Sequence, residues 1–541
     1  MRMRNVLPAT LAFSLLLFVP FVSSAQADVD PLVKMAGNDA PLAHSVRTGD
    51  MSPDRPITAA LAMKLHDETQ LELFLADLQD PASPRYHHFL TPAQFAESFA
   101  PTADEVAKVV TFLKKSGATG ISVSENRQTI TFQGSAGKLA STFHTPLGNY
   151  TDMTSGRPFY ANDIEPALPT SIASLVSGVI GLDDHAVRKS HARVSQGIAA
   201  PVTPPILRQA YQVNGLNATG RGVRVGLVEF AGFQQSDITT FDRTFGLSAP
   251  PVTTVPVNGV NLNSQGGDGE IEAELDIEVV HALAPAAENL VYEADNSPAG
   301  ELAMYQKIAA DQDVDVVSIS WGACESEEGK AQASAVNSAL ETGTAEGISY
   351  LVAAGDDGAA DCFRQNGSNA RAVDFPASSP AVTAVGGTKL SVTSGGGYAG
   401  EVVWNDGNAG GATGGGVSTL FKAPSNQGSS GGRSVPDVAA DAAPSTGYRI
   451  FSQGQWTTVG GTSGAAPLWA SFAALQNEVH GWQLGNLNPA LYRVGTSAGF
   501  NDVTSGDNSH EGAKGFKARR GFDQATGWGS FRGAALSKLL G

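Results

Sequence analysis

From about residue 223 onward, short apolar runs alternate with helical stretches, and this rhythm constrains the fold more than any other feature of the chain. The apolar runs occupy residues 223–230, 289–293, 314–320 and 348–353, and residues 270–283 read as a helix between the first two. Strands that are apolar throughout are typical of a parallel sheet covered by helices on both faces. We therefore predict an α/β domain with functional groups at the carboxyl ends of its strands.

The chain before this region has a different pattern, which indicates a second, smaller domain. We predict helices over residues 58–78 and 171–180, and strands over residues 121–124 and 130–132. Thr102-Ala103-Asp104-Glu105 resembles a capping box at the start of a further helix. Helices interleaved with alternating strands fit an α+β unit with a small antiparallel sheet.

The N-terminus has the features of a secretory signal peptide. Arg2 and Arg4 precede an apolar run over residues 11–22, and Ala25-Gln26-Ala27 follows as a small-residue cleavage site. We predict a signal peptide over residues 1–27 and a secreted protein, extracellular or periplasmic. Later apolar runs are too short to span a bilayer, so we expect the mature protein to be soluble and not bound to a membrane.

The overall charge disfavours nucleic-acid binding. The chain has 35 Lys and Arg against 53 Asp and Glu, a formal net charge of −18. Binding to phosphates needs clustered basic residues, so we expect no nucleic-acid partner. Export would permit a disulfide between Cys324 and Cys362, but two buried free thiols are equally compatible with the sequence.

The junction between the two predicted domains is basic and then rich in Ala and Pro. Residues 185–193 contain two His, two Arg and a Lys, and residues 197–205 carry the Ala and Pro. We interpret residues 185–200 as a linker exposed enough to be cut, with a plain interdomain spacer as the alternative. The predicted domains are therefore residues 28–184 and 201–541.

One Gly-rich turn suggests a nucleophile. Gly461-Thr462-Ser463-Gly464 leads into an apolar helix, which places the Ser463 hydroxyl beside unpaired backbone N–H groups at the helix start. A serine in this position is far more often a helix cap than a catalytic residue. A catalytic serine also needs a base, and His281 is one of the few histidines left beyond the linker.

Carboxylates fit the role of the base better than histidine does. Glu272 and Asp276 are four residues apart on the predicted helix and so share one of its faces. Two carboxyls that close can hold a single proton between them, although a solvated acidic face has the same spacing. Asp356 follows the strand-like run over residues 348–353, where a protonated carboxyl could donate to an oxyanion, or an ordinary Asp could cap a turn.

Taken together, these segments resemble the sedolisin family of serine-carboxyl peptidases of the pro-kumamolisin kind. The Gly461-Thr462-Ser463 turn with Pro467 is similar to the family's nucleophile motif, and Ala354-Gly355-Asp356 to its oxyanion segment. Residues 80–91 look like part of its activation domain. The resemblance implies a subtilisin-like fold preceded by a prodomain that acts as intramolecular inhibitor and is removed in acid.

The resemblance also implies a role for each candidate residue. Ser463 would be the nucleophile, Glu272 the base, Asp276 its orienting partner and Asp356 the oxyanion donor. Glu229 could extend the carboxyl network, and Ser318-Ile319-Ser320-Trp321-Gly322 looks like a strand of the family. The implied activity is a secreted, acid-active endopeptidase made as a zymogen, acting on protein or peptide substrates as a monomer.

A calcium ion is implied near the C-terminus by the same resemblance. Hard cations take oxygen ligands from carboxylates and backbone carbonyls. The implied ligands are the carboxylates of Asp502 and Asp523 and the carbonyls of Val503, Arg519 and Gly521. The Gly-rich stretches over residues 395–400, 407–416 and 428–432 would border the substrate cleft.

Two other functions remain open from the sequence. The first is a catalytically inactive, calcium-stabilised secreted binding protein on the same scaffold. The second is an ordinary subtilisin-like protease that uses His281 as its base. Aspartic and zinc proteases are disfavoured, because the sequence contains no Asp-Thr-Gly, Asp-Ser-Gly or His-Glu-x-x-His motif.

Overall fold

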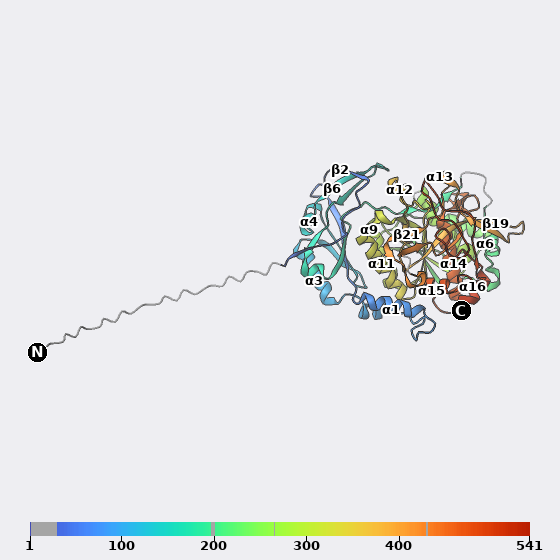
Figure 1. The fold of residues 1–541 in the computed structure, drawn as a ribbon, viewed down its shortest axis with the longest axis horizontal. Helices are drawn as coiled ribbons and strands as arrows, with labels where there is room; N and C mark the ends of the chain where they lie inside the picture. Colours follow the sequence, from blue (N-terminus) through green and yellow to red (C-terminus); the bar gives the residue numbers. More distant parts are fainter. Residues whose placement is uncertain (2–29, 196–200, 265, 429–430, 541) are drawn as a thin grey trace.

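The computed structural model describes residues 1, 30–195, 201–264, 266–428 and 431–540. The predicted signal peptide lies outside these residues, apart from Met1. In Figure 1 most elements from β1 to β9 form a domain on the left and the later elements a larger domain on the right, with α1 (Glu68–Gln79) at the lower centre. Helices α9 (Pro298–Asp311) and α11 (Lys330–Ala345) lie between the two.

The N-terminal domain is built on small antiparallel sheets, as predicted for an α+β unit. Its four-stranded sheet has the order β4-β5-β3-β9, a three-stranded sheet has the order β2-β6-β7, and β1 pairs with β8. The strands are β1 Leu32–Lys34, β2 Ser45–Asp50, β3 Pro56–Met63, β4 Thr119–Val123, β5 Thr129–Ser135, β6 Leu147–Asp152, β7 Pro158–Asn162, β8 Ala167–Pro169 and β9 Val176–Ile180. The helices are α1 Glu68–Gln79, α2 Pro92–Ser98, α3 Ala103–Lys115, α4 Ala136–Thr142 and α5 Thr170–Ala173. Thr102 and Glu105 form the predicted capping box at the start of α3.

Two helix predictions in this domain were wrong. Residues 58–78 divide into strand β3 and helix α1, and residues 171–180 divide into the end of α5 and strand β9. In β3, Ala59 and Leu61 face the core of the N-terminal domain, whereas Ala60 and Ala62 pack into a core of the C-terminal domain. The Ala-rich strand is therefore buried on both faces, and this tertiary packing overrides the helix preference of alanine.

The C-terminal domain contains the predicted buried parallel sheet. Its strand order is β13-β14-β12-β15-β17-β19-β20, with β23 also paired to β19, and the β19–β20 pair is antiparallel. The strands are β12 Arg224–Glu229, β13 Thr253–Pro256, β14 Glu288–Glu293, β15 Val316–Ile319, β17 Ser349–Ala353, β19 Thr383–Val392, β20 Tyr398–Val403 and β23 Val438–Asp441.

Helices cover both faces of this sheet. Within β15, Val316 belongs to one hydrophobic core and its neighbour Val317 to the other. One core is shared with α8 (Asp268–Leu283) and α14 (Thr462–His480), and the other with α9 and α11. The remaining helices are α6 Pro204–Ala210, α7 Gln235–Phe245, α10 Glu325–Glu328, α12 Phe363–Asn366, α13 Gly407–Gly410, α15 Asn488–Val494 and α16 Gly533–Leu540. The α/β prediction is thus confirmed.

Short strands outside the main sheet complete the C-terminal domain. They form the pairs β16–β18, β24–β25, β21–β22 and β26–β27. Their bounds are β16 Trp321–Cys324, β18 Asp374–Phe375, β21 Gly416–Lys422, β22 Gly432–Val435, β24 Tyr448–Ser452, β25 Gln455–Gly460, β26 Phe500–Asn501 and β27 Ser530–Phe531. Strands β10 (Lys189–Ser190) and β11 (Arg193–Val194), from the junction between the domains, join two of these small sheets.

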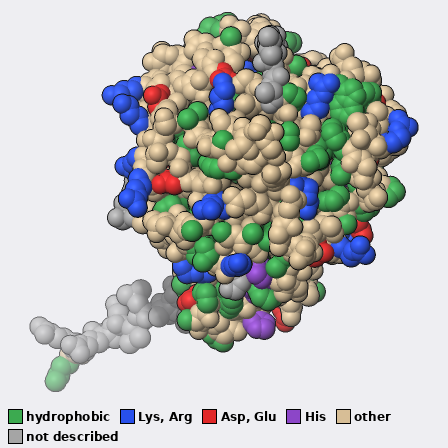
Figure 2. Space-filling view, turned by 90° about the vertical axis from the view of Figure 1, so that its right-hand side faces the viewer, with side chains coloured by type: hydrophobic (Ala, Val, Ile, Leu, Met, Phe, Trp, Pro, Cys, Tyr) green, Lys and Arg blue, Asp and Glu red, His purple; other side chains and the backbone are tan. Residues whose placement is uncertain are grey.

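Charged side chains of both signs are interspersed on the face in Figure 2, with apolar side chains among them. Among the helices of the described residues, none is long and apolar enough to cross a bilayer.

Candidate active site

Ser463 lies at the start of α14, immediately after strand β25. Gly461 precedes the helix with a φ of 97°, a conformation that favours glycine. The buried Ser463 hydroxyl donates a 2.8 Å hydrogen bond to Glu272 Oε2, and it lies 3.4 Å from the backbone oxygen of Ser320. The structure therefore brings together the serine and the carboxylate that the sequence singled out as candidates.

Glu272 and Asp276 lie one turn apart on α8, and both are fully buried. Burial raises the pKa of Glu272 to about 7, although the hydrogen bonds from Ser190 and Ser463 act to lower it. Burial raises the pKa of Asp276 well above its usual value, and the charge of Glu272 raises it further. The alternative interpretation of this spacing, a solvated acidic helix face, is therefore not found at these two positions.

A third carboxyl extends this pair. Glu229 ends strand β12 and is fully buried, and Trp321 Nε1 donates to its Oε2 at 2.8 Å. Burial, then the charge of Asp276, raises the pKa of Glu229. Ser320 Oγ lies 2.8 Å from both oxygens of Asp276. Carboxyls clustered in a medium of low dielectric favour shared protons over several negative charges.

Asp356 approaches the same turn from the carboxyl end of β17. It is fully buried, and its Oδ1 accepts hydrogen bonds of 2.9 Å from both the backbone N–H and the hydroxyl of Thr462. Its carboxyl therefore lies directly beside the turn that carries Ser463. This is the geometry in which a protonated carboxyl could stabilise an oxyanion.

The segment that we expected to be an exposed linker lies instead in the cleft between these groups. His185, Arg188 and His191 are buried. Strand β10 pairs antiparallel with β16, and β11 pairs antiparallel with β25. Backbone pairing in the cleft satisfies N–H and C=O groups that an exposed linker would leave to water. Residues 196–200, the rest of this predicted linker, lie outside the described residues.

The register of this segment places the His191–Ala192 peptide bond at Glu272, the hydrogen-bond partner of Ser463. His191 N donates to the Ser320 carbonyl at 3.3 Å, and Ala192 N donates to Glu272 Oε2 at 2.9 Å. The same carboxylate oxygen accepts from Ser190 Oγ at 2.5 Å. The amide nitrogen of the His191–Ala192 bond thus contacts the carboxylate that also contacts Ser463.

Side chains on the N-terminal side of this bond are held by charged groups. His191 Nε2 lies 3.3 Å from Asp374 Oδ2, and its Nδ1 lies 3.4 Å from Arg364 Nη2. Arg188, just upstream, is buried between Glu301 and Glu328. Sequence reasoning noted that this segment is basic, but the sequence does not show where the carboxylates that pair with it lie.

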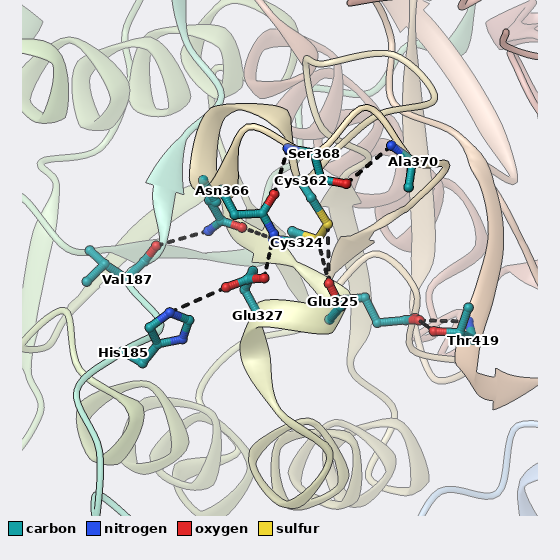
Figure 3. Close-up of a disulfide and its surroundings, with 12 residues drawn as sticks. His185, Val187, Cys324, Glu325, Glu327, Cys362, Asn366, Ser368, Ala370 and Thr419 are labelled. Carbon is teal, nitrogen blue, oxygen red and sulfur yellow. Dashed lines mark hydrogen bonds and ion pairs between the residues drawn. A yellow bond between two sulfur atoms is a disulfide. The ribbon is translucent and has the colours of Figure 1, made fainter. Parts of the chain in front are cut away.

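Cys324 and Cys362 form a disulfide, a choice that the sequence left open. Figure 3 shows it beside Glu325 and Asn366, with Glu327 linking Asn366 to His185 of the former linker. The bridge joins the end of β16 to the loop that follows Asp356. It therefore ties together two walls of the candidate site.

His281 does not lie at this site. It is nine residues beyond Glu272 on the same helix, and its Nδ1 lies 2.9 Å from Asp242 Oδ1. At a rise of about 1.5 Å per residue, the two side chains are separated by more than two helical turns. The structure therefore gives no support to a base at His281.

The residues implied as calcium ligands gather in one loop cluster. Asp502 Oδ2 accepts a hydrogen bond from Gly521 N at 3.1 Å, and Asp523 Oδ2 accepts one from Arg519 N at 2.9 Å. Val503 follows Asp502 directly. Among the described residues, neither carboxylate forms an ion pair with a basic side chain. Oxygen ligands whose two carboxylates form no ion pair fit a hard cation, and Asp523 Oδ1 also accepts hydrogen bonds from Ala525 N and Thr526 N.

A separate group of carboxylates lies on α7 and α8. Oxygens of Asp237, Glu270 and Glu274 lie within 4.8 Å of one another, and the three residues are buried. A group of this kind could hold a metal ion, but N–H groups of Gln234 and Gly454 already donate hydrogen bonds to all three carboxylates.

The fold and the site together define an α/β domain with a buried serine at a helix start, hydrogen-bonded to a buried carboxylate. Residues 259–529 match the profile of the subtilase family, and residues 43–185 match that of the pro-kumamolisin activation domain. Kumamolisin from Bacillus sp. (strain MN-32) is 35% identical over 92% of this chain and 94% of its own. Sedolisin from Pseudomonas sp. (strain 101) is 32% identical over 96% of this chain and 91% of its own.

A solved structure agrees with these matches. Pseudomonas sedolisin, a serine-carboxyl proteinase complexed with two molecules of pseudo-iodotyrostatin, aligns with a TM-score of 0.58 at 31% identity. The alignment covers 63% of this chain and 98% of that one. The chain belongs to the sedolisin family of serine-carboxyl peptidases, and it carries an activation domain of the pro-kumamolisin type.

Proposed function

We propose that this chain is the zymogen of a secreted, acid-active endopeptidase that uses Ser463, Glu272, Asp276 and Asp356. One observation carries the proposal: Glu272 Oε2 accepts hydrogen bonds from both Ser463 Oγ and Ala192 N. A general base that first deprotonates a nucleophile and then protonates a leaving amine must reach both atoms. Glu272 is the carboxylate with that reach.

In the proposed reaction Ser463 Oγ attacks the carbonyl carbon of the peptide bond, and Glu272 takes its proton. Asp276 and Glu229, whose pKa values are also raised by burial, hold further protons beside Glu272. Asp356, when protonated, donates a hydrogen bond to the tetrahedral oxyanion. The proton on Glu272 then passes to the leaving nitrogen, and water hydrolyses the resulting ester.

The need for a protonated Asp356 is the reason to expect activity in acid. An aspartic acid that donates a hydrogen bond to an oxyanion must carry a proton, and ordinary carboxyls do so only at low pH. We therefore propose that protein or peptide substrates are cut in an acidic medium by a monomer. Secretion rests on the signal-like sequence over residues 1–27.

The prodomain would inhibit the peptidase domain of the same chain until it is removed. We propose that maturation begins at the His191–Ala192 bond, because the Ala192 nitrogen lies at Glu272 and the His191 N–H pairs with Ser320 as an extended substrate would. This bond lies within residues 185–200, the segment that the sequence predicted to be cut.

We also propose one structural calcium ion at the C-terminal loops. Its ligands would be the carboxylates of Asp502 and Asp523 and the carbonyls of Val503, Arg519 and Gly521. The support is the oxygen-only donor set and the buried Asp523, whose pKa is raised by burial, as expected of a carboxylate that lacks a counter-charge. The ion would hold the two loops together at the end of the domain.

The decisive experiment compares the precursor with its Ser463→Ala variant at pH values from 3 to 7. We expect the precursor to shorten in acid, with a new N-terminus at Ala192 by sequencing, and then to digest a denatured protein. The Ser463→Ala precursor should remain intact. An intact wild-type precursor at every pH would favour the alternative, an inactive calcium-stabilised binding protein, whereas a variant that matures normally would exclude Ser463 as the nucleophile.

A further inference from the structure

Arg193 reaches the candidate oxyanion residue from within the segment that fills the cleft. Its Nε lies 3.1 Å from Asp356 Oδ2, and its Nη2 lies 3.1 Å from Asp357 Oδ1 and 3.3 Å from the Asp356 backbone oxygen. Asp356 is fully buried, whereas the Arg193 side chain is 22% exposed. A guanidinium group that donates to a buried carboxylate from this distance stabilises its charged form.

The two oxygens of Asp356 are therefore both acceptors in this structure. Oδ1 accepts from Thr462 N and Oγ1, and Oδ2 accepts from Arg193 Nε. A Cβ atom placed on Gly461 would lie 1.8 Å from the His191 carbonyl oxygen and 2.9 Å from Asp356 Oδ2. Asp356 Oδ2 thus lies on the side of the turn toward which the His191 carbonyl points. Its hydrogen-bond partner there is Arg193 Nε.

We propose that Arg193 is an autoinhibitory latch: its ion pair with Asp356 requires the carboxylate, whereas stabilising an oxyanion at His191 requires the carboxylic acid. The inference rests on the proposed function of Ser463, Glu272 and Asp356. At neutral pH the segment lies in the cleft in a substrate-like register and is not cut. Acid protonates Asp356, breaks the ion pair and frees the proton for the oxyanion.

The reaction that the Arg193–Asp356 ion pair would control is the first self-cleavage, at the His191–Ala192 bond. Ser463 Oγ forms a bond to the His191 carbonyl carbon, and the bond from that carbon to Ala192 N breaks. The hydroxyl proton passes through Glu272 to the Ala192 nitrogen, which leaves as an amine. Water then hydrolyses the ester, leaving a carboxyl group on His191 and restoring the Ser463 hydroxyl.

Several other charged groups surround Asp356, and they do not replace Arg193. The groups that interact with it electrostatically are Glu272, His191, Arg364 and Asp374, and Asp357 is the next residue along the chain. Asp361 lies in the same pocket as His191 and Arg364. Arg364, the other cation, donates to Asp357 Oδ2 at 2.6 Å. Among the residues that the structure describes, Arg193 is the basic side chain bonded directly to the Asp356 carboxylate.

The test is the pH at which half of the precursor is converted in a fixed time. We expect Arg193→Gln to raise this midpoint by about one to two pH units, because an opposite charge beside an Asp changes its protonation over that range. Arg193→Lys, which keeps the charge but loses the planar fork, should give a smaller rise. The new N-terminus is confirmed by sequencing.

Lys189→Gln is the matched control. Lys189 is another cation of the same segment, but it donates to the backbone oxygen of Arg364 rather than to Asp356. If loosening of the segment alone promoted cleavage, Lys189→Gln would raise the midpoint as much as Arg193→Gln does. An unchanged midpoint in Lys189→Gln, with a raised midpoint in Arg193→Gln, supports the latch.

The opposite results are equally clear. If Arg193→Gln slows conversion at every pH and leaves the midpoint unchanged, Arg193 is a substrate contact and the latch is wrong. The double variant Arg193→Gln/Ser463→Ala separates this failure from that of the proposed function. Conversion of the double variant would exclude Ser463 chemistry, whereas an intact double variant with an unshifted single variant would exclude the latch alone.

Discussion

The Ser463 hydroxyl donates a 2.8 Å hydrogen bond to Glu272 Oε2, without a histidine in the pair. If Glu272 is the general base, Glu272→Gln should slow self-cleavage of the precursor by about 10²–10⁴-fold, because a glutamine cannot accept the Ser463 proton. The conversion rate at pH 4, followed by gel densitometry, measures the effect. His281→Asn should leave this rate within a few-fold of the wild type.

Glu278→Gln is the matched control for Glu272→Gln. It is the same substitution on the same buried helix, but Glu278 accepts its hydrogen bond from Phe451 N rather than from Ser463. A similar loss of rate in both variants would mean that any change on α8 disturbs the site. In that case Glu272 would have no special role as base.

The disulfide between Cys324 and Cys362 should stabilise the C-terminal domain. It closes a loop with a sequence separation of 38 residues, which includes α11, β17 and Asp356. In the chain-entropy estimate a loop of this length contributes about 3–4 kcal/mol. We expect the Cys324→Ser/Cys362→Ser variant to have a clearly lower Tm than the oxidised wild type. Equal Tm values, with the bridge verified by mass, would contradict this expectation.

Removal of calcium should destabilise the protein through the C-terminal loops. A ligand present at about 100 times its Kd stabilises the folded state by about 2.7 kcal/mol. We expect a chelator to lower the Tm of the wild type and added calcium to restore it. Asp523→Asn should have the Tm of the chelated wild type, whether or not calcium is added. Asp507→Asn, a change in the loop between the two ligand carboxylates, should respond to calcium as the wild type does.

The chemical groups of the site were predictable from the sequence because each lies within one short motif. Glu272 and Asp276 are four residues apart, so they share a helix face wherever the helix lies in the fold. Asp356 follows an apolar strand. The small domain was harder, since β3 is rich in alanine and its extended form depends on packing against two separate cores. Tertiary contacts of that kind leave no local pattern.

The place of residues 189–194 was not predictable at all. Their basic, small side chains suit an exposed linker as well as they suit a cleft. Only the folded chain shows Arg193 against Asp356 and Ala192 against Glu272. These partners are 80 and 163 residues away in the sequence, so arguments from residue spacing cannot identify them.

Stability of the zymogen should fall as the pH rises from about 5 to 8, and Glu346 should account for part of this change. Burial raises the pKa of Glu346 from 4.5 to about 8, and its Oε2 has no hydrogen-bond partner among the described residues. Between these two values the folded protein holds a proton that the unfolded chain releases. The free energy of unfolding therefore decreases with rising pH across that window.

Glu346→Gln imitates the protonated carboxyl and should flatten this dependence. Measured in the Ser463→Ala background, so that the prodomain stays attached, the variant should match its parent at pH 4.5. At pH 8 it should exceed the parent Tm by at least about 2 °C. Glu68→Gln, a change at an exposed position, should follow the parent at both pH values. A variant that is less stable than its parent at pH 8 would show that Glu346 contributes its charge to the fold, because loss of an unfavourable buried charge can only raise the Tm there.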